Sequence, residues 1–347
     1  MSSAKWREPE GLAVVGAGSW GSALAIHLAR KGLKVKLWVY EKEVCEQIEQ
    51  YKENKTYLKD IHFPDNVVPS NELEEVVRGQ SVVLMVVPSH ITRTIVGKMA
   101  GFLSPGVIIC SATKGMENES LMTMSQVMAD VLPAGLAYSP ACLAGPSFAR
   151  EVGVGLPSAV TLACPNCDAG ERLREFFSSP LMRVYSSQDL MGVELGGALK
   201  NVFAIGAGIS DGLGLGTSAR AALITRGLAE MSRLGVHLGA NPLTFMGLAG
   251  VGDLVLTCTG DLSRNRTVGL KLGKGFKLKD ILNEMKMVAE GVKTTRSVHD
   301  LAGKENVDMP LTEQVYRVIY EDKDPRQGLM DLMTRSLKDE IDHHLMV

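Results

Sequence analysis

The chain has 347 residues, of which 45% are hydrophobic and 22% are charged, and its formal net charge is −2. This length suits two domains with separate cores, and the ordinary composition excludes a disordered chain. Scattered basic residues and a net charge near zero also argue against a nucleic-acid partner.

Neither a signal peptide nor a membrane anchor is predicted. Residues 1–11 contain charges and a proline, whereas a signal peptide has an apolar core. The longest uncharged span, residues 131–149, is interrupted by Pro133, Pro140 and Pro146, which a membrane helix would not tolerate. We therefore expect a cytoplasmic protein without a membrane partner.

Residues 12–25 predict a strand, a glycine turn and the start of a helix. Gly16, Gly18 and Gly21 have the G-x-G-x-x-G spacing. The first glycine permits a tight turn, the second lets backbone amides approach a pyrophosphate, and the third lets the helix pack close to the strand. A second strand follows at residues 35–39. A glycine-rich turn in another kind of α/β protein is the alternative, but this context favours dinucleotide binding.

Strand-like and helix-like stretches alternate through the first half of the chain. Further strands are predicted at residues 81–88, 106–111, 141–144, 159–163 and 183–186, with helices at 71–78, 91–99, 121–132 and 169–177 and a polar stretch at 41–65. The alternation indicates a doubly wound α/β sheet in a domain of residues 1–188. Ligands bind beyond the carboxyl ends of the strands in such sheets. This rule points to Lys114, which follows one strand, and to residues 144–149, which follow another.

Strand patterns cease after Asp189, so residues 189–347 are expected to form an all-helical domain. Its first helix, at residues 195–208, is apolar and rich in glycine, and it carries Lys200 in its middle. The positions three and four residues from Lys200 hold no acid. A buried lysine without a local partner tends to lose its proton or to bind a charged ligand, as a catalytic amine does. A lysine that reaches the surface or pairs with a distant acid is the alternative.

A second apolar helix, at residues 245–258, contains Asp253 as its only charge, with Thr257 one turn further on. An isolated acid and an isolated lysine on two apolar helices are natural partners. A buried, hydrogen-bonded aspartate that only organises the fold is the alternative. The segment 263–266, Ser-Arg-Asn-Arg, follows directly. It can hold a phosphate through a guanidinium, or it can be a solvated turn.

The six cysteines do not form the disulfide framework of a secreted protein. Cys164 and Cys167 have the spacing of a redox or zinc pair, but the sequence lacks a second ligand pair. Pro165 and Asn166 between them also fit a plain turn. We expect packing roles for most cysteines and no metal centre.

Taken together, these motifs make the chain resemble the NAD(P)-dependent glycerol-3-phosphate dehydrogenases, and the bacterial biosynthetic branch in particular. The resemblance runs from about residue 12 to about residue 320 and rests on five motifs in matching order: the glycine loop and residues 112–115, 145–149, 195–208 and 263–265. It implies a Rossmann-type domain, a helical substrate domain, and NAD or NADP as cofactor. It also implies the reversible reduction of dihydroxyacetone phosphate to sn-glycerol 3-phosphate, which begins phospholipid synthesis.

The resemblance further implies roles for individual residues. The general acid/base falls on Lys200. The substrate-binding positions are Lys114, Gly145, Ser147, Lys200, Asp253, Thr257, Ser263, Arg264 and Asn265. The cofactor-binding positions are Gly16, Gly18, Ser19, Trp20, Gly21, Tyr40, Lys114, Ala149, Arg264, Val288 and Glu290.

The chemistry of ketone reduction agrees with these roles. The reaction needs a hydride donor and a proton donor at the oxygen where negative charge develops. We expect Lys200 to donate the proton and Asp253 to orient and tune that lysine. Lys114 would add positive potential near the substrate, and Arg264 with Asn265 would bind the phosphate. Another β-hydroxyacid-type dehydrogenase and a non-catalytic nucleotide-sensing regulator are the alternatives. The expected partner is a small phosphate-bearing substrate, and a homodimer is one candidate assembly.

Cofactor preference depends on the end of the second strand. Tyr40 departs from the basic or histidine side chain that the family often carries there. Glu41 lies about 20 residues after Gly21, where NAD enzymes hold an acid for the ribose 2′-hydroxyl, but we expect it one position too late and directed into solvent. Lys42 beside it can meet a phosphate instead. We therefore expect both cofactors to be used.

Overall fold

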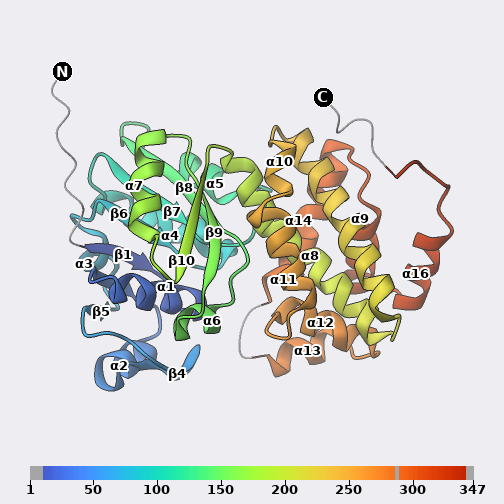
Figure 1. The fold of residues 1–347 in the computed structure, drawn as a ribbon, viewed down its shortest axis with the longest axis horizontal. Coiled ribbons are helices and arrows are strands. Elements are labelled where there is room, and N and C mark those ends of the chain that lie inside the picture. Colours follow the sequence, from blue (N-terminus) through green and yellow to red (C-terminus); the bar gives the residue numbers. More distant parts are fainter. Residues whose placement is uncertain (1–10, 286–288, 341–347) are drawn as a thin grey trace.

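In the computed structural model, the described residues are 11–285 and 289–340, and they form two lobes that lie side by side (Figure 1). The first lobe is a sheet covered by helices, and the second consists of helices. This arrangement matches the predicted fold class. Val288, one of the expected cofactor contacts, lies outside the described residues.

The first lobe is built on an eight-stranded sheet with the order β10-β9-β8-β7-β6-β1-β2-β5. Neighbouring strands are parallel except for β8 and β9, which pair antiparallel. The strands are β1 (Gly11–Val15), β2 (Lys34–Trp38), β5 (Val67–Ser70), β6 (Val82–Met85), β7 (Val107–Ser111), β8 (Tyr138–Ala144), β9 (Ser158–Ala163) and β10 (Met182–Ser187).

Helices cover both faces of this sheet. They are α1 (Ser19–Arg30), α2 (Lys42–Tyr51), α3 (Leu73–Val77), α4 (Thr92–Met99), α5 (Met124–Val131), α6 (Ala149–Val154) and α7 (Cys167–Phe177), with short 3₁₀ turns η1 (Ser89–Ile91) and η2 (Ala100–Phe102). Leu12 and Val14 of β1 share a core with α1 and α7, whereas Ala13 and Val15 share another with α4 and α5. The two-residue period of a strand thus serves two separate cores, which explains the continuous apolar runs.

The polar stretch at residues 41–65 contains structure that the sequence pattern did not predict. It forms α2 and a hairpin of β3 (Glu53–Asn54) and β4 (Leu58–His62), and the edge strand β5 follows it. Only Val44, Cys45 and Ile48 of α2 are buried, so its apolar face is narrow.

The second lobe is organised around α8 (Leu190–Gly212), which is buried along most of its length. Its other helices are α9 (Gly216–His237), α10 (Pro242–Phe245), the π-helical turn η3 (Leu248–Gly252), α11 (Asp253–Thr259), α12 (Arg264–Gly273), α13 (Leu278–Glu284), α14 (Glu290–Glu305), α15 (Pro310–Tyr320) and α16 (Pro325–Met333). We propose the domain boundary between residues 188 and 189, because β10 ends at Ser187 and Asp189 caps α8.

The glycines of α8 allow a close approach of two helix backbones. A Cβ atom at Gly208 would overlap the main-chain oxygen of Arg266 in α12, and one at Gly269 of α12 would overlap that of Ile205 in α8. A glycine inside a helix costs about 1 kcal/mol relative to alanine. Here that cost is offset by direct packing of α8 against α12.

The helix predicted at residues 245–258 is confirmed from Leu248 onward, but residues 246 and 247 interrupt it. The chain forms α10, then the π-helical turn η3, and then α11, whose first residue is Asp253. A Cβ atom at Gly250 would overlap the main-chain oxygen of Phe245, so the π-helical turn depends on a tight backbone contact. Single π-helical turns are frequent at functional sites.

Two helical stretches are long and apolar enough to cross a membrane, Leu190–Gly212 and Pro242–Thr259. In the first, 89% of the most apolar window is buried inside the protein, and in the second 39% is buried. Length and apolarity alone do not distinguish a core helix from a membrane span.

Candidate active site

The lone lysine of α8 and the lone acid of α11 lie in direct contact. Lys200 is 5% exposed, and its ammonium donates to the Asp253 carboxylate (2.7 Å) and to the Thr257 hydroxyl (2.7 Å). The Thr257 hydroxyl in turn donates to the main-chain oxygen of Asp253 (2.6 Å). The lysine is therefore held by two side chains from one helix.

Lys114 binds the other oxygen of the same carboxylate. It follows β7, and its ammonium donates to Asp253 (2.9 Å) and to the main-chain oxygen of Gly145 (3.0 Å). The Ser147 hydroxyl also donates to that oxygen (3.0 Å). Two ammonium groups thus share one carboxylate that is 1% exposed. One positive charge in excess remains in this cluster, which suits an anionic ligand or a developing oxyanion.

The surroundings of Lys200 weaken its hold on the proton. Burial lowers the pKa of its ammonium from 10.5 to about 8, the ion pair with Asp253 opposes this, and the nearby charge of Lys114 lowers it further. An amine with a pKa near the working pH can give and take a proton readily. The cluster is therefore suited to acid/base chemistry.

The predicted dinucleotide loop has the shape that the cofactor needs. Gly16 has φ +116°, and a Cβ atom there would lie 2.5 Å from the main-chain oxygen of Val86. A Cβ atom at Gly21 would overlap the main-chain oxygen of Gly16, whereas the same position at Gly18 is open. Gly18 is the N-cap of α1. Open space at a helix N-terminus fits a pyrophosphate.

Lys114 links this loop to the lysine cluster. Its ammonium lies 5.7 Å from the centre of the Trp20 ring at the start of α1. The glycine loop and the buried ion pairs are therefore neighbours, although they come from different lobes. Ala149, another expected cofactor contact, is the first residue of α6.

At the end of β2, Tyr40 is 75% exposed and contacts the edge of the Trp38 ring, with ring centres 6.0 Å apart. The expectation that Glu41 points into solvent is wrong. Its carboxylate accepts a hydrogen bond from the Tyr57 hydroxyl (2.8 Å). The main-chain oxygen of Tyr57 accepts from the hydroxyl of Ser19 (2.7 Å), so this contact is attached to the dinucleotide loop.

The segment 263–266 forms the start of α12. The Ser263 hydroxyl accepts from the Arg266 amide (3.2 Å) and caps the helix. The Arg264 guanidinium makes no hydrogen bond or ion pair with another described residue. Protein atoms around this exposed side chain desolvate it and lower its pKa, and the charge of Glu290 opposes this. Among the candidates for a phosphate ligand, Arg264 is thus available. Arg266 is not, because Asp211 (2.7 Å) and Asp261 (2.9 Å) bind it.

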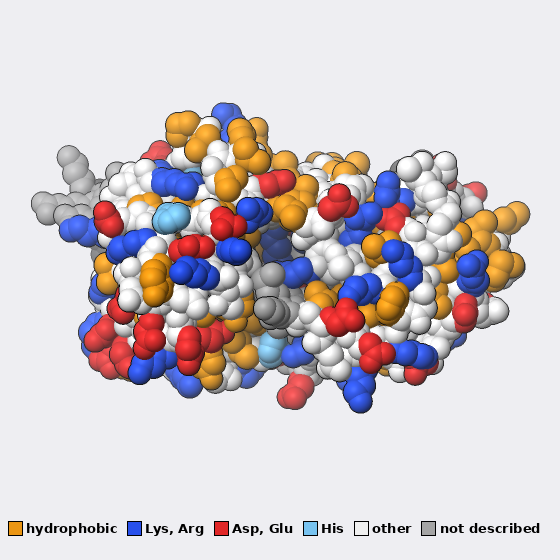
Figure 2. Space-filling model, turned by 90° about the horizontal axis from the view of Figure 1, so that it is seen from below, with side chains coloured by type: hydrophobic (Ala, Val, Ile, Leu, Met, Phe, Trp, Pro, Cys, Tyr) orange, Lys and Arg blue, Asp and Glu red, His pale blue; other side chains and the backbone are white. Residues whose placement is uncertain are grey.

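Asn265 is buried and already has two partners. Its amide donates to the Asn201 side chain (2.9 Å), and its oxygen accepts from the Gly291 amide (3.0 Å). Glu290, beside Gly291, accepts from the Ser89 hydroxyl of the first lobe (3.0 Å). These bonds connect α12, α14 and η1. Figure 2 shows that the surface is hollowed where the two lobes meet, with Lys and Arg side chains around the hollow.

Three residues near these groups were missed in the sequence. Asn201 follows Lys200 directly and donates to the main-chain oxygen of Lys114 (3.1 Å). A second polar side chain beside Lys200 in the apolar stretch 195–208 was a usable signal. Ser89 lies just past β6, at a strand end to which the rule for ligand sites applies. Nothing in the sequence pointed to Tyr57.

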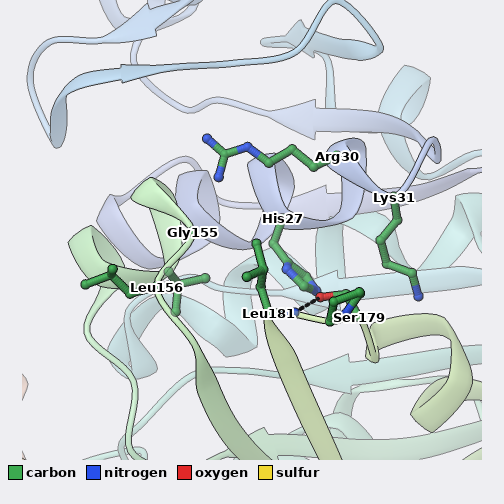
Figure 3. A pocket seen from close by; sticks show the side chains of 9 residues that line it. His27, Arg30, Lys31, Gly155, Leu156, Ser179 and Leu181 are labelled. Carbon is green, nitrogen blue, oxygen red and sulfur yellow. Dashed lines mark hydrogen bonds between the residues drawn. The ribbon is translucent and has the colours of Figure 1, made fainter.

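A separate pocket of about 240 Å³ is lined by the ends of α1 and α6 and by residues 179–181, just before β10 (Figure 3). His27 contacts the main-chain oxygen of Phe177 (2.9 Å), and the Lys31 ammonium donates to that of Glu175 (2.9 Å). None of the predicted site residues lines this pocket. It is not part of the candidate active site.

The pair Cys164 and Cys167 lies at the start of α7. Cys164 is buried, Cys167 is exposed, and the Asn166 side chain between them caps the helix by accepting from the Ala169 amide (3.1 Å). Within residues 11–285 and 289–340, no group of three or more His, Cys, Asp or Glu side chains could hold a metal ion.

The dinucleotide loop, the parallel-dominated sheet and the buried lysine cluster together define a two-lobed NAD(P)-dependent oxidoreductase. Family models agree in detail: residues 11–169 match the N-terminus and residues 189–330 the C-terminus of the NAD-dependent glycerol-3-phosphate dehydrogenases. The chain belongs to this family.

Individual relatives span nearly the whole chain. It is 53% identical over 331 residues to a glycerol-3-phosphate dehydrogenase (NAD(P)+) of Syntrophobacter fumaroxidans, with 95% of this chain and 97% of the relative covered. A relative of the same name from Geobacter sulfurreducens is 54% identical, with 95% and 99% covered. The crystal structure of glycerol-3-phosphate dehydrogenase from Coxiella burnetii is 42% identical, with a TM-score of 0.91 and coverage of 95% and 100%.

Proposed function

We propose that this enzyme reduces dihydroxyacetone phosphate reversibly to sn-glycerol 3-phosphate with NADH or NADPH, and that the product supplies glycerophospholipid synthesis. The observation that carries the proposal is the Asp253 carboxylate shared by Lys200 and Lys114 next to the dinucleotide loop. Family membership supports the same substrate. The bound nicotinamide would supply the hydride.

The residues of the chain would supply the proton and the charge. Lys200 would give its proton to the carbonyl oxygen, leaving a neutral amine. Together with the hydride that the nicotinamide would supply to the carbonyl carbon, this replaces the C=O π bond by one C–H bond and one O–H bond. Asp253 keeps the ammonium oriented, and Lys114 adds positive potential where negative charge develops. Arg264 binds the phosphate, because its guanidinium fork is not used by another described residue.

Turnover of dihydroxyacetone phosphate with NADH or NADPH, followed by loss of absorbance at the reduced nicotinamide band, tests the proposal directly. A β-hydroxyacid-type dehydrogenase would prefer a carboxylate substrate, and a nucleotide-sensing regulator would bind the cofactor without turnover. Substrate profiling against hydroxy acids of similar size separates the three. Absence of turnover by a folded, cofactor-binding protein would refute the proposed reaction.

The enzyme's setting is part of the proposal. We place it in the cytoplasm, in keeping with its small, diffusible substrate. A homodimer is the assembly to test, since Leu243 and Met246 of the α10 region are 74% and 64% exposed and exposed apolar groups often mark an interface. Light scattering in solution would measure the assembly.

A further inference from the structure

Glu194 is a buried acid of α8 that is not among the groups that bind Lys200. It is 6% exposed, and its carboxylate accepts hydrogen bonds from the Ser125 amide (2.8 Å) and the Ser125 hydroxyl (2.6 Å). Ser125 is the second residue of α5 in the first lobe. These bonds tie the helix that carries Lys200 to the dinucleotide-binding lobe.

The contact has a clear physical reason at the start of α5. The first amides of a helix have no partner within the helix. Thr123 and Gln126 form a capping box, in which each side chain accepts from the other's amide, but the Ser125 amide is outside this box. Glu194 accepts from it across the lobes (2.8 Å), so this amide gains a partner that its own helix does not supply.

The same face of α8 also holds the residues next to Lys114. Asn201 lies seven positions after Glu194, on the same helix face, and donates to the main-chain oxygen of Lys114 (3.1 Å). Gly197 lies between them, and a Cβ atom there would be 3.8 Å from Cγ of Lys114. Residues 112–123 connect β7 to α5. This face of α8 therefore contacts the connecting segment near its start and just beyond its end.

We infer that Glu194 is a positioning residue, which holds the segment 112–123 on α8 so that Lys114 reaches Asp253. With the segment fixed near both ends, the Lys114 ammonium is kept within bonding distance of Asp253 (2.9 Å) and Gly145 (3.0 Å). Misplacement of a reacting or charge-stabilising group by 1 Å can cost about a hundredfold in rate. The inference rests on the proposed reductase function, in which Lys114 stabilises developing charge.

Two substitutions of Glu194 weaken its contact with Ser125 to different extents. Glu194→Leu removes both acceptor oxygens, and we expect kcat with dihydroxyacetone phosphate to fall roughly 10²-fold. Glu194→Gln keeps a neutral acceptor for the Ser125 amide, so its kcat should fall by a smaller factor, about twofold to tenfold. A purely structural role would lower stability without this graded loss of kcat.

Glu230 provides the matched control. It is also buried (2% exposed) and accepts from the Leu311 (2.6 Å) and Thr312 (3.1 Å) amides at the start of α15. This contact lies within the helical lobe and involves none of the proposed site residues. Glu230→Leu and Glu230→Gln should therefore cost stability, as the Glu194 variants do, and leave kcat per folded molecule unchanged.

Hydrogen exchange measures positioning without any turnover. In Glu194→Leu, amide exchange over residues 112–128 should rise, and in Glu230→Leu it should stay at the wild-type level.

A second readout is the pH profile of kcat/KM for reduction. Lys200 is faced by Asp253, Lys114 and Cys258, and the charge of Lys114 lowers its pKa. If Glu194→Leu moves the Lys114 ammonium away, the pKa of Lys200 rises, and the fall of kcat/KM at alkaline pH should move to higher pH.

A folded Glu194→Leu variant with wild-type kcat, or with unchanged exchange over residues 112–128, would overturn the inference. If the leucine variants do not fold, the two glutamine variants decide it, and equal kcat in both would overturn it. Should the wild type fail to reduce dihydroxyacetone phosphate, the proposed function falls, while the exchange experiment still tests the role of Glu194.

Discussion

The Lys200 cluster and the end of β2 are both expected to recognise a ligand, yet they are built in opposite ways. Lys200 and Asp253 are 5% and 1% exposed, and each has charged partners in the interior. Tyr40 is 75% exposed, and Glu41 has a tyrosine hydroxyl as its partner. A buried charge that loses its partner is costly, whereas an exposed side chain changes partners at little cost.

The comparison indicates which property of the enzyme is rigid and which is adjustable. Chemistry depends on the cluster, where few arrangements satisfy all the buried charges. Cofactor preference depends on the end of β2, where a small change in side-chain contacts can shift the balance between NADH and NADPH. Substitutions in the cluster should therefore have large effects and substitutions at the strand end small ones.

The largest effect is expected for Lys200→Met, which keeps the length of the side chain and removes the amine. Loss of a positioned acid or base typically costs ~10²- to 10⁴-fold in rate, so kcat should fall by that factor while nucleotide binding survives. Fluorescence titration with NADH and steady-state kinetics measure the two properties. Lys304→Met, at an exposed position of α14, is the control. A folded Lys200→Met enzyme with near-normal kcat would exclude the role.

A smaller but still strong effect is expected for Arg264→Ala. Hydrogen bonds between charged groups contribute about 1.5–3 kcal/mol, so kcat/KM for dihydroxyacetone phosphate should fall roughly tenfold to a hundredfold. Arg264→Lys should rescue it poorly, because the planar fork is lost. The comparison with unphosphorylated dihydroxyacetone isolates the phosphate contact. If the variant prefers the phosphorylated substrate as strongly as the wild type, Arg264 is not the phosphate ligand.

The pH dependence should show opposite signs for the two directions of the reaction. Reduction needs protonated Lys200, and burial lowers its pKa to about 8, so kcat/KM for reduction should fall above about pH 8. The decline approaches tenfold per pH unit. Oxidation needs the neutral amine, so its kcat/KM should fall below about pH 8. If kcat/KM for reduction and kcat/KM for oxidation changed with pH in the same direction, measured in one buffer series, proton transfer by Lys200 would be contradicted.

The sequence was most informative where burial imposes a strict requirement. The glycine loop could be predicted because a Cβ atom at Gly16 or Gly21 would meet main-chain atoms. The pair of Lys200 with Asp253 could be inferred because each was the only charge on an apolar helix, and buried charges need partners. A position without room for a Cβ atom needs glycine, and a buried charge needs an opposite charge. Both requirements determine the type of residue and can therefore be read from the sequence.

What could not be predicted depends on contacts between distant segments. The hairpin of β3 and β4 is short, and β3 has two residues, too few for a periodic pattern. The π-helical turn before Asp253 depends on how closely Gly250 approaches Phe245. The bond between Ser89 and Glu290 joins residues 201 positions apart. Polar side chains of this kind are common on surfaces, and only the fold selects their partners.

The contact between Tyr57 and Glu41 gives the smallest expected effect and tests the adjustable side of the comparison. In its present position, Glu41 accepts from the Tyr57 hydroxyl (2.8 Å), and this bond competes with a ribose 2′-hydroxyl for the carboxylate. Tyr57→Phe keeps the ring and removes the hydroxyl. Glu41 is then released to accept from the ribose of NADH, while its charge repels the 2′-phosphate of NADPH.

We expect the wild type to use both cofactors with a selectivity of no more than about a hundredfold, or ~2.8 kcal/mol. Tyr57→Phe should shift the ratio of kcat/KM for NADH over NADPH toward NADH by several-fold, up to about tenfold, since one neutral-to-charged hydrogen bond is exchanged for another. Glu41→Gln should shift the ratio the other way, because the repulsion of the 2′-phosphate is lost. In the double variant the gain for NADH should disappear, and Tyr51→Phe, at an exposed position of α2 (50%), should leave the ratio unchanged. A Tyr57→Phe enzyme whose ratio stays at the wild-type value would show that the end of β2 selects the cofactor through other groups.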